Sequence, residues 1–362
     1  MIICFVGPAN SAHIVKWCRW FTARGHEIHV ISFTKGVIQG VDVHLVDISV
    51  NTNGNDLSKL RYLFTGKKIK RIINSINPDI INVHYATSYG AAMALSNIKG
   101  YVLSVWGSDI YEFPNKSPLH KYLLKYSLKK AEYLFSTSRA MAKEAAKYTN
   151  KQFSITPFGV DVNLFNPNNR SRNESDREFV VGTVKSLSDV YGINKIIEAV
   201  AQIKNNKSIP IKLRIAGKGP KEEEYRQLAI ELGIDDITEW LGFISQKDAA
   251  KEWANMDVAI IPSISESFGV SAVEAQACGT AVIISDAPGL LEATNPDISS
   301  IVVENGDVEG IVEALVFLAS HDNIRKTMGE RGRQFVENNY EINNCFEQIE
   351  TLFISICQRR KS

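Results

Sequence analysis

The chain has 362 residues, of which 44% are hydrophobic, and this is enough apolar material for two cores of ordinary size. No run reaches the roughly 18 consecutive apolar residues of a transmembrane helix, and no basic segment precedes the first apolar run, as it would in a secretory signal. We therefore expect a cytoplasmic protein. The five cysteines are scattered without metal-ligand spacing, so we expect neither disulfides nor a bound metal.

The charge is distributed unevenly along the chain. Residues 1–160 hold 20 Lys and Arg against 9 Asp and Glu, a net charge of +11, whereas the remainder carries −10. A basic N-terminal half suits an anionic partner such as a phospholipid surface or a pyrophosphate-linked substrate. Solvated surface lysines are the alternative explanation. No aromatic and basic platform accompanies the charge, so we expect no nucleic-acid partner.

Apolar runs and helical patterns alternate along the first half of the chain. A run at 2–6 is followed by a glycine turn, an amphipathic stretch that ends at Gly25, and a second run at 27–32. Further helices are expected at 69–76, 90–95 and 119–130, and further strands at 80–83, 102–106 and 133–137. This alternation predicts a parallel sheet that is covered by helices on both faces.

The composition changes near Thr156, where Pro, Asn, Gly and charged residues replace the apolar runs. We interpret 161–178 as a linker between an N-terminal domain, 1–160, and a C-terminal domain, 179–340. Residues 341–362 are expected to form a helix that packs back on the N-terminal domain. Strands of the C-terminal domain are expected at 179–184, 212–216, 237–241, 258–262 and 281–284.

The most informative segment follows the expected strand 258–262. Glu266 lies before a helix that should begin near Gly269, and Glu274 lies about one turn into that helix. The free N–H groups at a helix start bind anions such as a diphosphate, and a glycine lets the phosphates approach closely. Ionised carboxylates accept the hydrogen bonds that sugar hydroxyls donate. The segment therefore predicts a site for a sugar diphosphate.

Glu266 and Glu274 lie in the string ESFGVSAVEAQACG, which resembles the E-x7-E signature of the family 4 retaining glycosyltransferases. Other segments resemble the same family over nearly the whole chain, namely ARGHEIHVIS, WGSDI, TPFGVDVNLF, IAGKGP and WLGFIS. The resemblance implies an α/β fold of the GT-B type, in which two doubly wound Rossmann-like domains face each other across a cleft. The N-terminal domain would bind the acceptor and the C-terminal domain the nucleotide sugar.

The resemblance also implies roles for individual residues. Glu266 would bind the donor hexose and Glu274 the ribose, while Lys185 stands where many members have a phosphate-binding Arg and supplies the charge without the bidentate fork. The remaining donor contacts are expected from the amides of Phe268, Gly269 and Val270 on the diphosphate, from the backbone of Phe243 and Ile244 on the base, and from Gly7 and Ser267.

The sequence departs from the family pattern in two places. Family members usually carry a lysine just before the glycine of the segment 188–192, but here no basic residue follows until Lys195. Trp106 stands where many members have a histidine of the acceptor pocket. The candidates for acceptor contacts are His13, His84, Trp106 and Asp109, all of which are expected in or beside loops that follow strands.

The expected reaction follows from the residues that are present and from the resemblance. No nucleophile with an adjacent base is recognisable, so retention would proceed by front-face attack, with the departing phosphate taking the acceptor proton. Glu266, Lys185 and Asp109 are the expected catalytic residues, and no metal or other cofactor is expected. The donor would be a UDP-linked hexose or N-acetylhexosamine, and the acceptor a hydroxyl of a glycan or lipid-linked glycan.

Three other classes of protein are weighed against this one. A nucleotide-sugar epimerase or hydrolase on the same two-domain plan is the nearest alternative. A dehydrogenase is less well supported, because neither half contains the G-x-G-x-x-G fingerprint between strand and helix. A non-enzymatic sugar-binding protein would normally need an export signal.

A basic helix is expected within the segment 116–130. Leu119, Tyr122, Leu123 and Tyr126 fall near one helical stripe, and Lys121, Lys125, Lys129 and Lys130 are distributed around it. Such a helix can rest on an anionic bilayer, which would place the enzyme peripherally on the inner face of the cell membrane. Lys67, Lys68, Lys70 and Arg71 form a second basic cluster. Alternatively, the apolar stripe packs on the sheet and the lysines face water.

Overall fold

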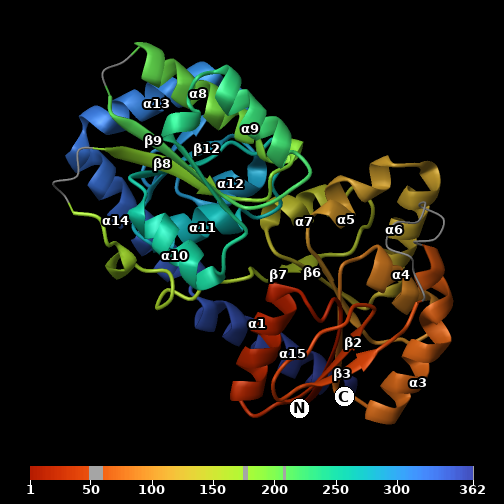
Figure 1. The fold of residues 1–362 in the computed structure, drawn as a ribbon. Coiled ribbons are helices and arrows are strands. Elements are labelled where there is room, and N and C mark those ends of the chain that lie inside the picture. The colour runs from red at the N-terminus through yellow and green to blue at the C-terminus, as the bar shows by residue number, and fades with distance from the viewer. Residues whose placement is uncertain (49–59, 174–177, 207–208, 362) are drawn as a thin grey trace. The chain divides into compact units, whose positions relative to one another are not determined.

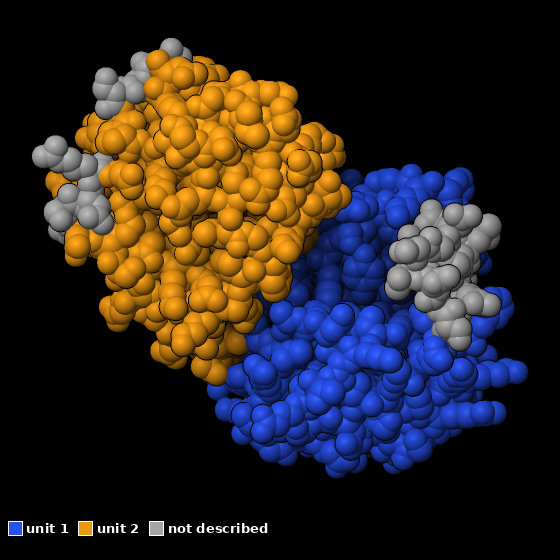
Figure 2. All heavy atoms as spheres, in the orientation of Figure 1, with its two compact units in different colours: residues 1–158, 345–362 blue, residues 159–344 orange. Residues whose placement is uncertain are grey.

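The structure is a computed structural model that describes residues 1–48, 60–173, 178–206 and 209–361. It divides into two compact units, which Figure 2 shows in different colours. Unit 1 comprises residues 1–158 and 345–362, and unit 2 comprises residues 159–344. Each unit is built on one sheet whose strands alternate with helices along the chain (Figure 1).

The sheet of unit 1 has seven strands in the order β3-β2-β1-β4-β5-β6-β7, and all neighbours run parallel. The strands are β1 Ile2–Val6, β2 Glu27–Ser32, β3 Asp42–Leu45, β4 Ile80–His84, β5 Val102–Val105, β6 Tyr133–Ser136 and β7 Phe153–Ile155. The strands predicted in this half are present. β3 and β7 are additional, because both are short edge strands without a run of buried residues.

The helices of unit 1 cover this sheet. They are α1 Ala12–Ala23, η1 Leu60–Thr65, α3 Gly66–Ile76, α4 Ser88–Leu95, α5 Ser108–Tyr111, η2 Phe113–Asn115, α6 Pro118–Lys130, α7 Arg139–Ala145 and α15 Ile342–Lys361, which belongs to unit 1 from Cys345 on. In α1 the buried residues Ile14, Trp17, Cys18 and Phe21 recur at helical spacing, so one apolar stripe faces the sheet. The ring of Trp17 meets that of Phe5 in β1 edge-on at 5.7 Å.

The C-terminal helix α15 completes the core of unit 1. Phe346 and Phe353 are fully buried, and Phe346 packs against Trp17 of α1 with ring centroids 5.5 Å apart. Phe353 lies between Phe21 of α1 and Phe135 of β6, at 5.7 and 6.1 Å. The last segment of the chain therefore packs against elements from the first 140 residues.

The sheet of unit 2 has six parallel strands in the order β10-β9-β8-β11-β12-β13. The strands are β8 Phe179–Val184, β9 Ile211–Ala216, β10 Thr238–Gly242, β11 Val258–Ile261, β12 Ala281–Ser285 and β13 Ser300–Val303. The helices are η3 Pro167–Asn169, η4 Asp189–Tyr191, α8 Ile193–Asn206, α9 Glu222–Glu231, η5 Asp235–Ile237, α10 Gln246–Asn255, α11 Val270–Ala277, α12 Pro288–Ala293, α13 Val308–Ser320 and α14 Asp322–Tyr340. The five predicted strands are present, and β13 is additional.

The strand order reverses beside the first strand of each sheet. β1 lies between β2 and β4, and β8 lies between β9 and β11. In doubly wound sheets, ligands bind at the carboxyl ends of the strands at this switch point. Gly7 follows β1 and His84 ends β4, while Lys185 follows β8 and Glu266 lies in the loop after β11. The topology thus brings four predicted site residues to the two switch points.

The segment 161–178, which the composition suggests is a linker, belongs to unit 2 wherever the structure describes it; residues 174–177 lie outside the described residues. Arg170 and Arg172 each form an ion pair of 2.8 Å with Asp257, which directly precedes β11. This segment is therefore attached to the sheet of unit 2 by paired charges.

The structure decides which face of α6 packs inward. Leu124, Ser127 and Leu128 are buried, whereas Leu119 and Tyr122 are 56% and 64% exposed. Leu119 and Tyr122 therefore face water, whereas Leu123 and Tyr126 of the same predicted stripe are half-buried. The polar Ser127 tolerates the inward position because its hydroxyl donates to the carbonyl of Leu123 at 3.0 Å.

Candidate active site

The loop between β11 and α11 has the geometry that its sequence predicts. Gly269 caps α11 with φ of 92°, and a Cβ atom there would lie 2.9 Å from Leu290 and 3.1 Å from Ala293, so only glycine fits. The amides of Ala272 and Val273 are used within the helix, since both donate to the carbonyl of Gly269. Earlier N–H groups of the helix start remain suited to an anion.

The predicted phosphate ligand and the predicted sugar ligand form one ion pair. The Lys185 Nζ atom donates to Glu266 Oε2 at 2.6 Å, and each side chain is only 11% exposed. The Ser263 hydroxyl donates to the same carboxylate oxygen at 3.3 Å. β8 and β11 are neighbours, so the loops that follow them lie side by side. The sequence identifies both residues but not their pairing, because they are 81 positions apart.

Glu274 has a partner that the sequence analysis does not anticipate. It lies on α11, and Trp253 of α10 donates from its indole Nε1 to Glu274 Oε2 at 3.4 Å. Trp253 is fully buried, so its ring is a fixed donor that orients the carboxylate. The spacing of apolar residues along α10 indicates that Trp253 lies on its buried face. It does not indicate that the indole of Trp253 contacts Glu274.

The other predicted donor residues differ in what they offer. The side chain of Phe268 is buried against Tyr340, with ring centroids 5.1 Å apart, so only its backbone is available to a ligand. Ser267 and Val270 are half-buried in the same loop and helix start. Phe243 is 80% exposed after β10, and Ile244 beside it is half-buried.

Lys195 is paired within its own helix. It lies on α8, and its Nζ atom is 2.9 Å from Glu198 Oε2, one turn further along. In the part of unit 2 that the structure describes, Lys185 is the cation that pairs with Glu266. Lys185 also contacts a ring: its Nζ atom lies 4.4 Å from the ring centroid of Tyr191, a residue that the sequence analysis does not single out.

Three of the predicted acceptor residues come together in unit 1. The ring of Trp106 lies 5.6 Å from that of His13 and 5.4 Å from that of His84. His13 stacks on Phe158 with centroids 3.9 Å apart. Gly7 borders the same cluster, since a Cβ atom on it would lie 3.3 Å from the Cβ atom of His84. The cluster is formed at the carboxyl ends of the strands, as predicted.

Both histidines of this cluster are uncharged at neutral pH. Burial, with a smaller contribution from His13, lowers the pKa of His84 to about 3. Burial, followed by the nearby charge of Lys16, lowers the pKa of His13 to about 4. Among the described residues, neither ring nitrogen of His84 has a hydrogen-bond partner, although the side chain is fully buried. A neutral imidazole with unused donor and acceptor atoms is chemically suited to a substrate hydroxyl.

Asp109, a predicted acceptor contact, is enclosed by the backbone of its own unit. It is fully buried and accepts hydrogen bonds from the amides of Ala86, Trp106 and Gly107 at 2.8, 3.1 and 2.8 Å. Burial raises its pKa, although these amides act in the opposite direction. Its contacts join the loops after β4 and β5, so the structure shows it holding the backbone beside the aromatic cluster.

Tyr85 adds a strained backbone to the same region. It directly follows His84 and has φ of 79°, in the left-handed region that non-glycine residues seldom occupy. Its hydroxyl contacts that of Ser108 at 2.5 Å, which ties it to the loop after β5. The sequence carries no signal for this conformation, because neither a glycine nor an asparagine marks the position.

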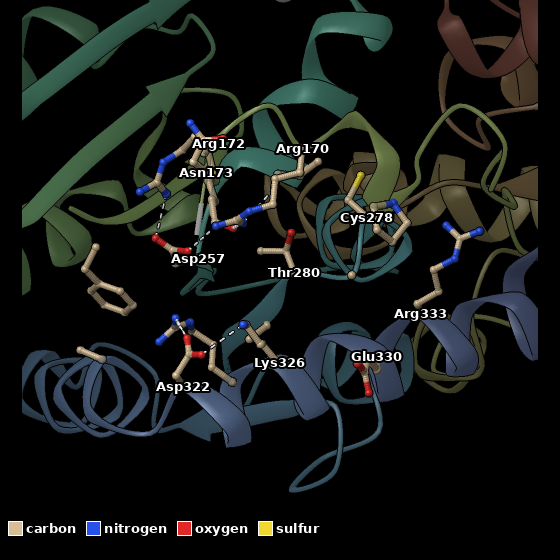
Figure 3. A pocket seen from close by; sticks show the side chains of 18 of the residues that line it. Arg170, Arg172, Asn173, Asp257, Cys278, Thr280, Asp322, Lys326, Glu330 and Arg333 are labelled. Atoms are coloured by element: carbon tan, nitrogen blue, oxygen red, sulfur yellow. Dashed lines mark hydrogen bonds and ion pairs between the residues drawn. The ribbon is translucent and has the colours of Figure 1, made fainter. Parts of the chain in front are cut away.

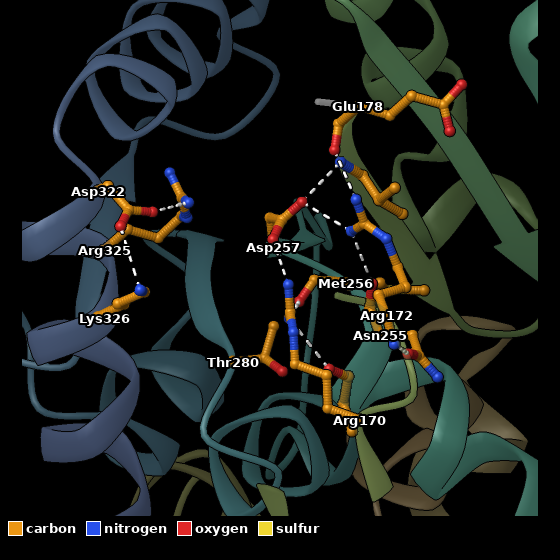
Figure 4. Close-up of polar contacts among 12 residues, drawn as sticks. Arg170, Arg172, Glu178, Asn255, Met256, Asp257, Thr280, Asp322, Arg325 and Lys326 are labelled. Carbon is orange, nitrogen blue, oxygen red and sulfur yellow. Dashed lines mark hydrogen bonds and ion pairs between the residues drawn. The ribbon is translucent and has the colours of Figure 1, made fainter. Parts of the chain in front are cut away.

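A separate hollow in unit 2 lies at the opposite ends of the strands. Its lining includes Phe179, which begins β8, Asp257, which precedes β11, and Ala281, which begins β12 (Figure 3). Several of the charges drawn there are paired: Arg170 and Arg172 with Asp257, and Arg325 and Lys326 with Asp322 (Figure 4). None of the predicted site residues lines this hollow, so the candidate active site is the pair of switch points.

Solved structures resemble this arrangement of sheets. Sucrose-phosphate synthase from Thermosynechococcus elongatus superposes with a TM-score of 0.82 at 18% identity and covers 98% of this chain and 99% of its own. The Anabaena protein Alr3699/HepE, solved in complex with UDP-glucose, superposes with a TM-score of 0.78 at 17% identity and covers 98% and 100%. The fold is therefore the GT-B fold of glycosyltransferases, as predicted.

Sequence comparison agrees with the fold. Residues 2–138 match the family described as "Glycosyl transferase 4-like", and residues 165–335 match "Glycosyl transferases group 1". N-acetyl-alpha-D-glucosaminyl L-malate synthase of Bacillus anthracis is 23% identical over 100% of this chain and 98% of its own length. A "MMP alpha-(1->4)-mannosyltransferase" of Mycolicibacterium hassiacum is 30% identical over 51% of this chain and 44% of its own.

The two matches together span most of the chain, which is therefore a glycosyltransferase of the group 1, family 4 type. The alternative of an epimerase or hydrolase is not favoured by these relatives. Among the described residues, no helix combines the length and apolarity needed to cross a membrane, and no cluster of three potential metal ligands occurs.

Proposed function

We propose that this enzyme transfers a hexose or N-acetylhexosamine from a UDP-sugar to a hydroxyl of a glycan or lipid-linked glycan, with retention of configuration. The observation that carries the proposal is the Lys185–Glu266 pair, which lies at the switch point of unit 2 beside the start of α11. A cation, a hydrogen-bond acceptor and the N–H groups of a helix start within one loop region match the phosphates and hydroxyls of a nucleotide sugar.

The proposed reaction forms one glycosidic bond and breaks another. The acceptor oxygen attacks the anomeric carbon, the bond from that carbon to the β-phosphate oxygen breaks, and the departing diphosphate takes the acceptor proton. Lys185 and the amides of Phe268, Gly269 and Val270 would stabilise the negative charge that develops on the diphosphate. Glu266 would accept a hydrogen bond from a sugar hydroxyl. Because these groups supply the positive charge, we propose transfer without a metal ion.

In this scheme Lys185 changes partner when the donor binds. Without ligand its ammonium is neutralised by Glu266 at 2.6 Å. A diphosphate would compete for the ammonium, which frees one oxygen of Glu266 for the sugar. The pair therefore keeps both charges satisfied in a region where each side chain is only 11% exposed, and an unpaired charge there would be costly.

The donor is tested by thermal shift with a panel of UDP-, GDP- and ADP-sugars. A donor present at 100 times its dissociation constant should add about 2.7 kcal/mol of apparent stability. We expect the UDP-sugars to give the largest shift, in line with the UDP-glucose complex of the Anabaena protein. A larger shift with GDP- or ADP-sugars would reject UDP as the base while leaving the nucleotide-sugar site in place.

The two carboxylates are tested by substitution. Glu266→Gln and Glu274→Ala should each lower transfer at least tenfold, because each removes an acceptor or orienting charge for the donor. Glu266→Gln leaves the Lys185 ammonium without its charged partner, so this variant should melt at a lower temperature, and transfer is measured at a temperature where circular dichroism shows both variants to be folded. Glu330→Gln, at the separate hollow of unit 2, serves as the control. Near-normal turnover of both variants would remove the assignment.

We propose that unit 1 provides the acceptor contacts through His13, His84 and Trp106. Aromatic faces pack on sugar rings and neutral imidazoles exchange hydrogen bonds with hydroxyls, and the cluster offers both. Asp109 would act through the backbone that it holds. Measuring hydrolysis of the donor with and without acceptor separates transfer from hydrolysis: consumption at full rate without an acceptor would contradict a transferase.

We further propose that α6 contacts an anionic membrane, where a lipid-linked acceptor would be found. Its outward face carries Leu119 and Tyr122 together with the exposed Lys121, Lys125 and Lys129. No acidic residue lies between Phe113 and Ala131. Exposed apolar side chains among lysines suit the boundary between headgroups and acyl chains, and each lysine near such a surface contributes about 1 kcal/mol.

Sedimentation with vesicles tests this contact. Vesicles that contain anionic phospholipid should bind the enzyme, and salt should weaken binding steeply. Lys125→Glu with Lys129→Glu should abolish it, whereas the matched pair Lys247→Glu with Lys251→Glu, four positions apart on α10 of unit 2, should not. No sedimentation at low ionic strength, or equal loss in both variants, would contradict the proposal and favour a soluble acceptor.

A further inference from the structure

The ammonium of Lys185 contacts both a carboxylate and an aromatic ring. Nζ donates to Glu266 at 2.6 Å and lies over the ring of Tyr191, 4.4 Å from its centroid. A cation within about 6 Å of a ring centroid is attracted by the negative face of the ring. Tyr191 is thus the neutral partner of a cation whose other partner is charged.

The backbone around Tyr191 explains why the ring is held there. Tyr191 ends the short helix η4, and Gly192 follows with φ of 66°. A Cβ atom on Gly192 would lie 2.3 Å from the carbonyl oxygen of Pro262, so glycine allows this turn to pack directly on the end of β11. The amide of Ile264 donates to the carbonyl of Val190 at 2.8 Å.

These contacts join the turn 189–192 to the loop that contains Glu266. The Lys221 ammonium also reaches Asp189 at 3.2 Å, which holds the other end of the turn. Tyr191 is half-buried and packs against the hydrophobic core of unit 2. The ring therefore has a fixed position relative to the loop of Glu266, and both contact the ammonium of Lys185.

The two partners of Lys185 differ once a donor is bound. A diphosphate competes with Glu266 for the ammonium, but it does not compete with the face of a ring. A lysine also loses rotamer entropy when it is fixed, and an ammonium lacks the rigid fork of a guanidinium. A ring that holds the ammonium before and after binding reduces this loss, because less freedom remains to be lost at the binding step.

We infer that Tyr191 is a positioning residue, which holds the Lys185 ammonium in place for the diphosphate of the donor. The inference rests on the proposed function, since it takes Lys185 to be the cation that binds the diphosphate. It assigns to Tyr191 an effect through Lys185 and not a contact with the reacting atoms. The phenol hydroxyl is not required; the ring is.

Binding of UDP and of uridine to three variants tests the inference by calorimetry. Tyr191→Leu keeps the apolar packing but removes the ring, and it should weaken UDP binding roughly three- to thirtyfold. Tyr191→Phe keeps the ring and should remain within about twofold of the wild type. Uridine lacks phosphate, so its affinity should be unchanged in both. Tyr191→Met serves as a second ring-free variant should the leucine variant prove unstable.

A double-mutant cycle distinguishes positioning from a general structural effect. Lys185→Ala alone should weaken UDP far more than uridine. Tyr191→Leu added to Lys185→Ala should then cause no further loss, because the group on which the ring acts is gone. Phe179→Leu is the matched control: it removes the cation–π contact with Arg325, 5.4 Å from the ring centroid, at the other end of β8. It should leave UDP binding unchanged.

The outcomes separate this inference from the proposed function. Additive losses in the cycle, or equal weakening of UDP and uridine by Tyr191→Leu, would overturn the role of Tyr191 while leaving the donor site intact. If wild-type enzyme bound no nucleoside diphosphate, the proposed function would fail and the inference with it. The role of Tyr191 would be established by a loss of affinity that affects UDP but not uridine and is non-additive in the cycle, together with unchanged UDP affinity in Tyr191→Phe.

Discussion

At the level of one residue, His84 is a predicted site residue whose burial is unfavourable for folding. Its ring is fully buried, its pKa is lowered to about 3, and neither nitrogen has a partner among the described residues. A buried polar group without a partner costs about 1–3 kcal/mol. A core residue chosen for packing alone would be apolar, and this cost is what a role of the nitrogen atoms in acceptor binding, as proposed above, would account for.

Replacement of this histidine should therefore separate stability from activity. His84→Leu has a similar volume and removes the unpaired nitrogens, so we expect the free energy of unfolding to stay level or rise by about 1 kcal/mol. Transfer should fall at least tenfold while UDP binding in unit 2 stays normal. Urea denaturation and acceptor kinetics measure the two effects. A large loss of stability with unchanged transfer would assign His84 to the core alone.

At the level of elements, ion pairs attach the segment around Arg170 to the sheet of unit 2, because this segment has few apolar residues that could pack there. The segment that contains Arg170 and Arg172 has few apolar residues, and both guanidinium groups converge on Asp257 (Figure 4). Burial acts to raise the pKa of Asp257, but hydrogen bonds from Arg172, Arg170 and the Val180 amide outweigh it and lower the pKa. The carboxylate therefore stays ionised where the first strand of unit 2 begins.

Asp257→Asn should destabilise unit 2 substantially. The Asp257 side chain is 8% exposed, and removing one partner from a buried ion pair costs on the order of 3 kcal/mol. Asp322→Asn is the matched control, because Asp322 also pairs with two cations beside the same hollow but is 53% exposed. Its loss should stay below about 1 kcal/mol. Urea unfolding of both variants compares them, and equal losses would contradict this account.

The attachment of α15 should depend on pH. His26 lies 2.6 Å and Arg24 lies 2.9 Å from Glu350, whose side chain is 14% exposed. Burial acts to raise the pKa of Glu350, but the contacts with His26 and Arg24 dominate and lower it. A carboxyl with a lowered pKa in the folded state stabilises the fold above its unfolded pKa of about 4.3, and this stability disappears as the pH falls through the folded value.

Melting curves of the wild type and of Glu350→Gln measure this contribution. The wild type should melt higher at pH 6, and the difference should shrink towards zero below about pH 4. Glu347→Gln is the control on the same helix, since Glu347 is 52% exposed and pairs with Arg24 at 3.3 Å. A constant difference between wild type and Glu350→Gln across this range would show that the charge of Glu350 is not involved.

At the scale of the whole molecule, the chain returns to its starting unit. Residues 345–362 belong to unit 1 although all of 159–344 forms unit 2. Phe346, Ile349, Phe353 and Ile356 are each at most 3% exposed, and burying one such side chain contributes about 1.5–3 kcal/mol. Their sum is comparable with the whole stability of an ordinary domain.

A chain that ends at Asn344 should consequently lose the fold of unit 1 and keep that of unit 2. Limited proteolysis should cleave residues 1–158 rapidly, while UDP binding persists. A chain that ends at Cys357 is the control, because it keeps the four buried side chains of α15 and should resist protease. Protection of unit 1 in the shorter chain would show that α15 is dispensable for it.

The sequence by itself determined the α/β alternation and most strands, because buried parallel strands are continuous apolar runs that stand out without tertiary information. The GT-B type followed from the resemblance of its motifs to family 4 glycosyltransferases. Glu266 and Glu274 were singled out because a helix start after a strand has a local signature, and Lys185 was singled out through the family resemblance; their roles are predictions. The edge strands β3, β7 and β13 lack such runs and were visible only in the folded sheet.

Only the tertiary structure decided the contacts between residues distant along the chain. The order of strands brings Lys185 to Glu266, and the turn ending at Gly192 brings Tyr191 to Lys185. Burial changed Asp109 from an expected acceptor ligand into a support of the backbone, and it showed that Leu119 and Tyr122 face water. The physical reason is that local sequence encodes periodicity, whereas pairing, burial and pKa depend on neighbours that only folding brings together.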